Sequence, residues 1–188
     1  PWKKLSIDSL KNFDTPLWNP YSFSGTPNLA NFQSGAFYIL NIVFLMPFSI
    51  GWSLFIILQP LLAGVFMYLF LRNLRLDNLP SFFGGIIFAF AGFFTTWLEW
   101  GNILHTALWL PLILLSIDKL EKNMTLFLLL VFSLSSSFFA GHLQIFFYLF
   151  LTSILYFFFR FWNKKKTSFL LLFLLSLLLT VVIVLPQL

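Results

Sequence analysis

The feature that most constrains this chain is a series of long apolar runs that carry almost no charge. Five of them are about as long as a helix needs to cross a membrane, roughly 17–25 residues. They are Ser49–Leu71, Phe82–Leu98, Met124–Ala140, Leu143–Phe159 and Ser168–Leu185. A sixth run, Ile103–Ile117, is shorter and contains Pro111. Because backbone groups in lipid must be hydrogen-bonded within the protein, we expect these runs to be helices.

The composition argues against a soluble protein. Hydrophobic residues make up 60% of the 188 residues and charged residues only 9%, whereas a soluble domain carries about 25% charged residues. A soluble helical domain also needs a polar face on each helix, and most of these runs have none. We therefore predict an all-α fold, a polytopic transmembrane helical bundle of about six spans with an N-terminal outer loop and an interfacial helix.

Basic residues gather in alternate connections between the runs. Eight of the eleven lie in three connections, at Arg72, Arg75, Lys119, Lys122, Arg160, Lys164, Lys165 and Lys166. The connections Glu99–Asn102 and Gly141 hold none, so the positive-inside rule assigns the basic connections to the cytoplasm. This explains the net charge of +5 without a nucleic-acid partner. Trp97, Trp100 and Trp109 then fall near the outer ends of their spans, as in an aromatic belt.

The chain divides into three predicted parts. Residues 1–35 are polar and form an extracytoplasmic loop, residues 36–48 form an interfacial or re-entrant helix, and residues 49–188 form the bundle. The run Ala36–Met46 is about 17 Å long as a helix, half a bilayer; if it did span, residues 1–35 would lie in the cytoplasm. Both ends look cut, since the chain starts at Pro1 and stops directly after an apolar run, so we expect a fragment of a longer protein.

Small residues and prolines within the runs predict how the helices pack. Ser133, Ser135, Ser136 and Ser137 are expected at close helix contacts, because small residues let helices approach in lipid. Gly84, Gly85 and Gly92 are interpreted in the same way, and Pro60 is expected to kink the first span.

Polar side chains on the predicted outer side are candidates for chemistry. Glu99 lies between two tryptophans, His105 opens the short run, and His142 and Gln144 follow the tight turn at Gly141. Ionisable groups near hydrocarbon usually face a cavity or a partner. Each also has a structural interpretation: Glu99 can mark the water boundary, and the histidines can anchor or cap helix ends.

The N-terminal loop is rich in turn-forming residues and contains aromatic and amide side chains. Trp18 and Tyr21 can anchor the loop to lipid headgroups or stack on a sugar ring, and Asn19, Asn31 and Gln33 can contact sugar hydroxyls. A purely structural lid over the helices is an equally good explanation, because prolines and glycines make the loop rigid and tightly turned.

Three separated motifs carry a resemblance to a known family. The strings PLWNPYSFSGTPNLANFQSGAFY, HTALWLPLILLSIDKL and AGHLQIFFY resemble, in the same order, the pattern of the YfhO-like bacterial membrane proteins. The resemblance covers nearly the whole chain. It implies the GT-C superfamily of glycosyltransferases, which use polyprenyl-phosphate-linked sugars at the outer face of the plasma membrane, although fold follows from such kinship more securely than activity.

The resemblance also implies a site. In GT-C enzymes the key acidic residue usually lies in the first outer loop, and the YfhO-like pattern implies an Asp a few residues before Pro1-Trp2. We therefore expect this residue N-terminal to the chain, and the chain alone to be inactive. Asp8, Asp14, Glu99 and His142 are weaker catalytic candidates. Substrate-binding candidates are Trp18, Asn19, Tyr21, Asn31, Gln33, His105, His142 and Gln144, and positive charge for the lipid phosphate comes from the histidines and from Lys3, Lys4 and Lys11.

The expected partners are membrane lipid, a polyprenyl-phosphate-linked sugar donor and a cell-envelope polymer or protein acceptor. No cofactor is predicted, and no spacing supports a divalent metal. Two other functions remain open from the sequence: a transporter or flippase of lipid-linked precursors, and a structural membrane subunit.

Overall fold

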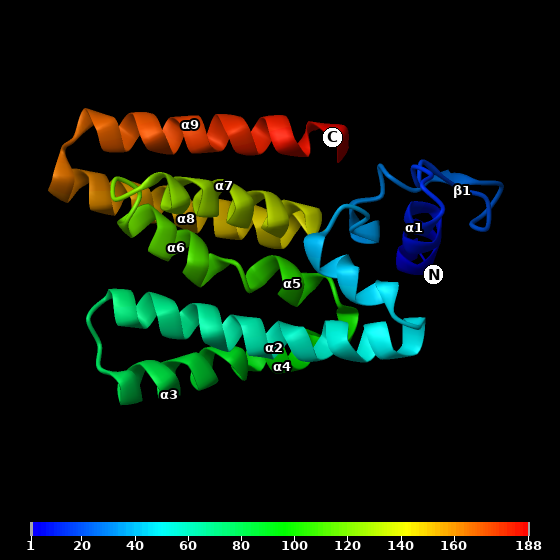
Figure 1. The fold of residues 1–188 in the computed structure, drawn as a ribbon, viewed down its shortest axis with the longest axis horizontal. Helices are drawn as coiled ribbons and strands as arrows, with labels where there is room; N and C mark the ends of the chain where they lie inside the picture. The colour runs from blue at the N-terminus through cyan, green and yellow to red at the C-terminus, as the bar shows by residue number, and fades with distance from the viewer. Residues whose placement is uncertain (1, 188) are drawn as a thin grey trace.

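The computed structural model describes residues 2–187, most of which are helical (Figure 1). An N-terminal part contains α1 (Trp2–Lys11), strands β1 (Trp18–Asn19) and β2 (Thr26–Pro27), and 3-10 helices η1 (Phe32–Ser34) and η2 (Ile39–Leu45). The bundle contains α2 (Phe48–Asn73), α3 (Asn78–Ala89), α4 (Gly92–Trp97), η3 (Leu98–Trp100), α5 (Ile103–Ala107), α6 (Leu110–Asp118), α7 (Met124–Phe139), α8 (Leu143–Lys164), α9 (Thr167–Val184) and η4 (Leu185–Gln187).

The chain runs back and forth between two ends of the bundle (Figure 1). At one end, which we call the basic end, lie the connections at residues 74–77, 119–123 and 165–166. At the other, which we call the loop end, lie residues 2–47 and the connections at residues 98–102 and 140–142. The structure therefore gathers the basic connections at one end, as their alternation along the sequence predicts.

Four segments are long and apolar enough to cross a membrane. They are Phe48–Asn73, Asn78–Trp100, Leu143–Asn163 and Thr167–Gln187. The segments Ile103–Asp118 and Met124–Phe139 are apolar but shorter. The structure thus supports the all-α membrane fold. Of the six expected spans, four are long enough to cross a membrane and two are shorter.

Helices α2 and α3 pack closely because two glycines meet between them. A Cβ atom at Gly85 would lie 2.8 Å from the carbonyl oxygen of Gly64, and one at Gly64 would lie 3.5 Å from the Ala89 side chain. The prediction for Gly85 is confirmed, and Gly84 abuts Leu71 of α2. The prediction for Gly92 is wrong: a Cβ there would meet nothing within 4 Å, because Gly92 starts α4 away from its neighbours.

The serine cluster of α7 lies in the interior, as expected for close helix contacts. All four serines are buried, and the Ser137 hydroxyl donates a 2.8 Å hydrogen bond to the Thr106 carbonyl of α5. Such a bond across helices replaces one that water cannot provide in this interior.

One buried carboxylate joins three helices at the basic end. Asp118, at the end of α6, has a side chain only 4% exposed. Its oxygens accept bonds of 2.7 Å from the Asn73 amide of α2 and the Tyr156 hydroxyl of α8, and it forms a 2.7 Å ion pair with Arg160. A buried carboxylate with this many donors fixes the mutual position of the helices, because removing one partner leaves buried charge unpaired.

The segment at residues 36–48 is a short 3-10 helix rather than an α-helix. Helix η2 packs against the first turns of α2, and Phe44 is buried there against Phe55 with ring centroids 5.3 Å apart. Pro47 precedes α2 directly. The N-terminal part is thereby attached to the loop end through an aromatic contact.

Candidate functional site

A pocket of about 410 Å³ opens at the loop end, and we call it the loop-end pocket. Helix α1, η1, the start of α2 and the connection before α5 all contribute to it. Its lining consists of Trp2, Lys3, Lys4, Gln33, Phe48, Trp52, Trp100 and Asn102. The pocket thus combines cations, indole rings and amides, the groups that bind an anionic or a hydroxylated ligand beside an apolar one.

Lys3 is the most unusual residue of the loop-end pocket. Its ammonium group donates a 3.0 Å hydrogen bond to Asn41 Oδ1 and lies 4.4 Å from the centre of the Phe55 ring. Within residues 2–187 no carboxylate forms a salt bridge with it. Desolvation by these neighbours lowers the pKa of Lys3 to about 7. An anion entering the pocket would favour the protonated form of Lys3, which has no carboxylate partner within residues 2–187.

Aromatic rings form an apolar wall of the same pocket. Phe48 and Trp52, one turn apart on α2, stack with centroids 6.2 Å apart, and Trp52 stacks on Phe55 at 6.1 Å. Trp100 is 61% exposed, so its indole face is open to a ligand. Aromatic faces of this kind stack on sugar rings or pack against isoprenoid chains.

A second, smaller pocket adjoins the first and collects three of the residues predicted from sequence. Its volume is about 290 Å³, and Gln33, His142 and Gln144 line it with Phe32, Gly141 and Leu143. Gln33 lines both pockets. Gly141 allows the connection before α8 to pack against η1. Its φ of +97° suits glycine, and a Cβ there would overlap the Phe32 carbonyl oxygen.

His142 has a structural task in this pocket as well. It is the N-cap of α8, where its Nδ1 accepts a 3.4 Å hydrogen bond from the Ile145 N–H. Burial lowers the pKa of His142 below its ordinary value. Gln144 is exposed and donates to the Tyr148 hydroxyl at 2.9 Å. Both side chains can therefore exchange hydrogen bonds with a ligand.

His105, by contrast, lies in the interior and not in a pocket. It is fully buried, and both ring nitrogens are paired. Nε2 lies 2.9 Å from the Phe55 carbonyl oxygen, which can only accept, so Nε2 carries the proton. Nδ1 then accepts from the Tyr38 hydroxyl at 3.0 Å, and that hydroxyl accepts from Trp109 Nε1 at 3.3 Å.

This chain of hydrogen bonds leaves His105 no donor or acceptor for a substrate. We therefore assign His105 to the fold rather than to the site. The prediction that Trp109 belongs to an aromatic belt is wrong. Its side chain is only 3% exposed, and its N–H donates to the Tyr38 hydroxyl inside the bundle.

The residues predicted around the N-terminal hairpin lie apart from both pockets. Asn19 is buried, and its amide group closes the hairpin turn by bonding Ser22 Oγ and the Tyr21 N–H, each at 2.9 Å. Asn31 caps η1 by accepting from the Gln33 N–H. Trp18 and Tyr21 are exposed, 55% and 84%, but line neither pocket.

The acidic candidates are all at the surface. Asp8, Asp14 and Glu99 are exposed, and no carboxylate lines either pocket. Glu99 directly precedes Trp100 of the loop-end pocket and is thus the carboxylate nearest to it along the chain. Within residues 2–187 no cluster of three or more histidine or acidic groups could hold a metal ion.

Four residues that line the loop-end pocket were not singled out from the sequence: Trp2, Phe48, Trp52 and Asn102. Trp52 follows Phe48 by four residues, so a helical projection places both rings on one face. That pattern was available in the sequence, but the contribution of α1 was not, because it depends on how residues 2–47 fold back.

Comparisons with protein-family models, with curated proteins and with solved structures find no match.

Proposed function

We propose that this chain carries the substrate pocket of a GT-C glycosyltransferase of the YfhO-like kind. In this proposal all six apolar segments cross the plasma membrane of a bacterium, the basic end faces the cytoplasm and the loop end faces outward. The donor is a sugar linked to polyprenyl phosphate, and the acceptor is a hydroxyl of a cell-envelope polymer or protein. The single observation that carries the proposal is the lining of the loop-end pocket.

The lining suits such a donor group by group. Lys3 and Lys4 offer charge to the lipid phosphate, which leaves with the bonding electrons when the sugar is transferred. Stabilising that leaving charge by fixed cations lowers the barrier. Trp52 and Trp100 offer faces for the sugar ring or the isoprenoid chain, and Gln33 and Asn102 offer amides for sugar hydroxyls.

The acceptor hydroxyl must lose a proton during transfer, and a carboxylate is the usual base. In this chain Glu99 is the proposed candidate, because it adjoins Trp100. His142 and Gln144 in the neighbouring pocket are proposed to hold the acceptor, since Gln33 connects the two pockets.

A binding experiment tests the proposal on the chain itself. Tryptophan fluorescence is titrated with a polyprenyl-phosphate-linked hexose and, separately, with the matching polyprenol without phosphate. We expect the phosphate-linked compound to bind at least tenfold more tightly, and Lys3→Gln with Lys4→Gln to remove that advantage. Lys11→Gln is the matched control, because Lys11 ends the same helix outside the loop-end pocket. Equal affinity for the polyprenol would contradict the proposal.

A second function, transport of lipid-linked precursors, is favoured by one observation. Two of the apolar segments are interrupted, between Ala89 and Gly92 and between Ala107 and Leu110, and interrupted helices often form transporter sites. The two functions differ in their products. Movement of a labelled lipid-linked sugar across vesicles without a new glycosidic bond would favour transport, whereas label in an acceptor would favour transfer.

A further inference from the structure

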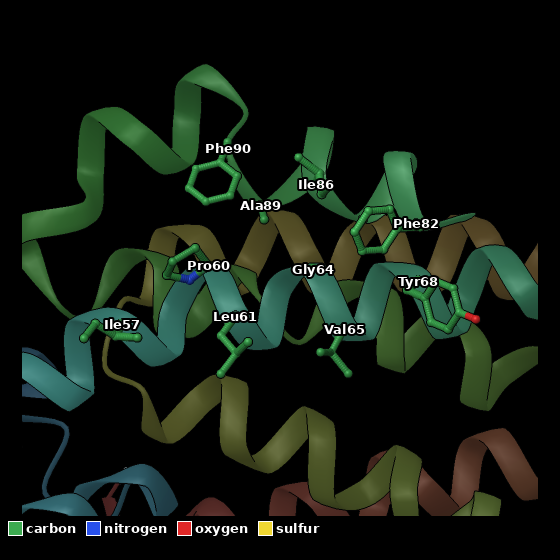
Figure 2. A pocket seen from close by; sticks show the side chains of 11 residues that line it. Ile57, Pro60, Leu61, Gly64, Val65, Tyr68, Phe82, Ile86, Ala89 and Phe90 are labelled. Carbon is green, nitrogen blue, oxygen red and sulfur yellow. The ribbon is translucent and has the colours of Figure 1, made fainter. Parts of the chain in front are cut away.

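A groove between α2 and α3 shares no lining residue with the loop-end pocket, and Figure 2 shows its side chains. Its volume is about 510 Å³. The lining residues are Ile57, Pro60, Leu61, Gly64, Val65, Tyr68, Phe82, Gly85, Ile86, Ala89 and Phe90. Tyr68 is the one lining residue with a polar side-chain group, so the groove has the character of hydrocarbon along almost its whole length.

Small residues form the floor of this groove and large ones its rims. Gly64 and Gly85 let the two backbones touch, while Figure 2 shows Phe90 near Pro60 and Phe82 near Tyr68 along the length of α2. The rim residues are open to the surroundings, with Phe90 63% and Phe82 56% exposed. Both helices belong to segments apolar enough to cross a membrane, so the groove opens toward lipid.

Two arginines follow the groove residues of α2 along the chain, at the basic end. Tyr68 is the last lining residue of α2, and Arg72 follows it by four residues, on the same face of the helix. Arg72 and Arg75 are both exposed. Asp77, the carboxylate of the same connection, makes no salt bridge with them in the part of the chain that the structure describes. An apolar groove followed by two arginines without a salt bridge is complementary to an anionic lipid, which has apolar chains and a negatively charged headgroup.

We propose that this groove binds one anionic phospholipid, with an acyl chain along Pro60, Gly64 and Gly85 and the phosphate beside Arg72 and Arg75. A zwitterionic phospholipid fits less well, because its own cation would lie near the arginines. A second copy of this chain fits less well too, since it would bring two arginine pairs together and like charges repel. The site is separate from the proposed sugar-transfer pocket and does not depend on it.

Native mass spectrometry of the protein released from vesicles of equal phosphatidylglycerol and phosphatidylcholine tests this site. We expect one phosphatidylglycerol to remain bound to the wild type. Leu61→Trp places a large ring in the groove and is expected to remove the lipid. Arg72→Gln and Arg75→Gln are each expected to reduce the retained phosphatidylglycerol about fivefold, because a basic residue near a lipid surface contributes about that factor.

Two matched variants serve as controls. Leu69→Trp makes the same change at an exposed position of α2 outside the groove, and Lys122→Gln removes a charge from another connection at the basic end. Both should retain the lipid. The proposal is overturned if phosphatidylcholine is retained equally, if Leu61→Trp retains as much lipid as Leu69→Trp, if added polyprenyl phosphate displaces phosphatidylglycerol, or if the protein is a dimer that closes the groove.

Discussion

Polar residues beside the apolar runs of this protein either stabilise the interior or line a pocket, and their position in the sequence does not distinguish these two roles. His105 and His142 are both histidines next to apolar runs, yet one is enclosed with both nitrogens paired and the other borders a pocket. The difference arises from Tyr38, the N-cap residue of η2, whose hydroxyl lies 3.0 Å from His105 Nδ1 of α5. No local pattern around His105 reports a partner 67 residues away.

The hydrogen-bond chain through Tyr38 predicts a specific loss of stability. Tyr38→Phe leaves His105 Nδ1 without a donor and Trp109 Nε1 without an acceptor, both in the interior. We expect the free energy of unfolding to fall by about 2–4 kcal/mol, since each unsatisfied buried group costs about 1–3 kcal/mol. Thermal unfolding in detergent measures this. Tyr148→Phe is the control, because its hydroxyl is bonded at the exposed surface, and an equal loss there would contradict the assignment.

Lys3 predicts a pH dependence with a definite sign. Its pKa is lowered from 10.5 to about 7 by desolvation, so between pH 7 and 10.5 the unfolded chain binds more protons than the folded one. Stability should therefore rise with pH across this window. The rise is less than the full ~1.4 kcal/mol per pH unit, because Lys3 is only half-buried.

Melting temperatures measured from pH 7 to 9.5 test this sign. Lys3→Met should flatten the rise, and Lys11→Met should keep it. A wild-type stability that falls over the same range, or a slope unchanged by Lys3→Met, would show that Lys3 is not desolvated as described.

At the scale of elements, α2 and α3 cross where Gly64 faces Gly85. Gly85→Ala forces a Cβ to within 2.8 Å of the Gly64 carbonyl oxygen, and we expect a loss of about 1–3 kcal/mol from overpacking. Gly92→Ala meets open space and should leave stability unchanged or raise it by up to about 1 kcal/mol. Equal effects of the two variants in thermal unfolding would contradict this packing.

The same elements show what sequence could predict. The presence of the long helices follows from the apolar runs, and their ends follow from the polar connections between the runs. Both can be predicted from local sequence alone. The break between Ala89 and Gly92 was not predicted. The 3-10 form of Ile39–Leu45 was not predicted either, because this segment packs against α2 in the folded chain. The Asp118 cluster was missed for the same reason: Asp118, Asn73 and Arg160 meet only once three helices are assembled.

At the scale of the whole molecule, two chemically different ends face away from each other (Figure 1). The loop end carries aromatic, amide and partly buried cationic groups around two pockets, and the basic end carries exposed lysines and arginines. Charge alternation along the sequence was enough to predict this polarity. It was not enough to predict which residues would line the pockets. Gln33, His142 and Gln144 were named as candidates from the sequence, whereas Trp2 and Trp52 were not.

The most direct measurement of the central claim is single-cysteine labelling, which is clean here because the chain contains no cysteine. Cysteines are placed at Glu99 and Gln144 of the loop end and at Lys122 and Lys165 of the basic end, and intact cells are treated with a membrane-impermeant maleimide. We predict labelling at 99 and 144 in intact cells, and at 122 and 165 only after the membrane is permeabilised. Simultaneous labelling of both pairs in intact cells would place the two ends on one side of the membrane and contradict the account.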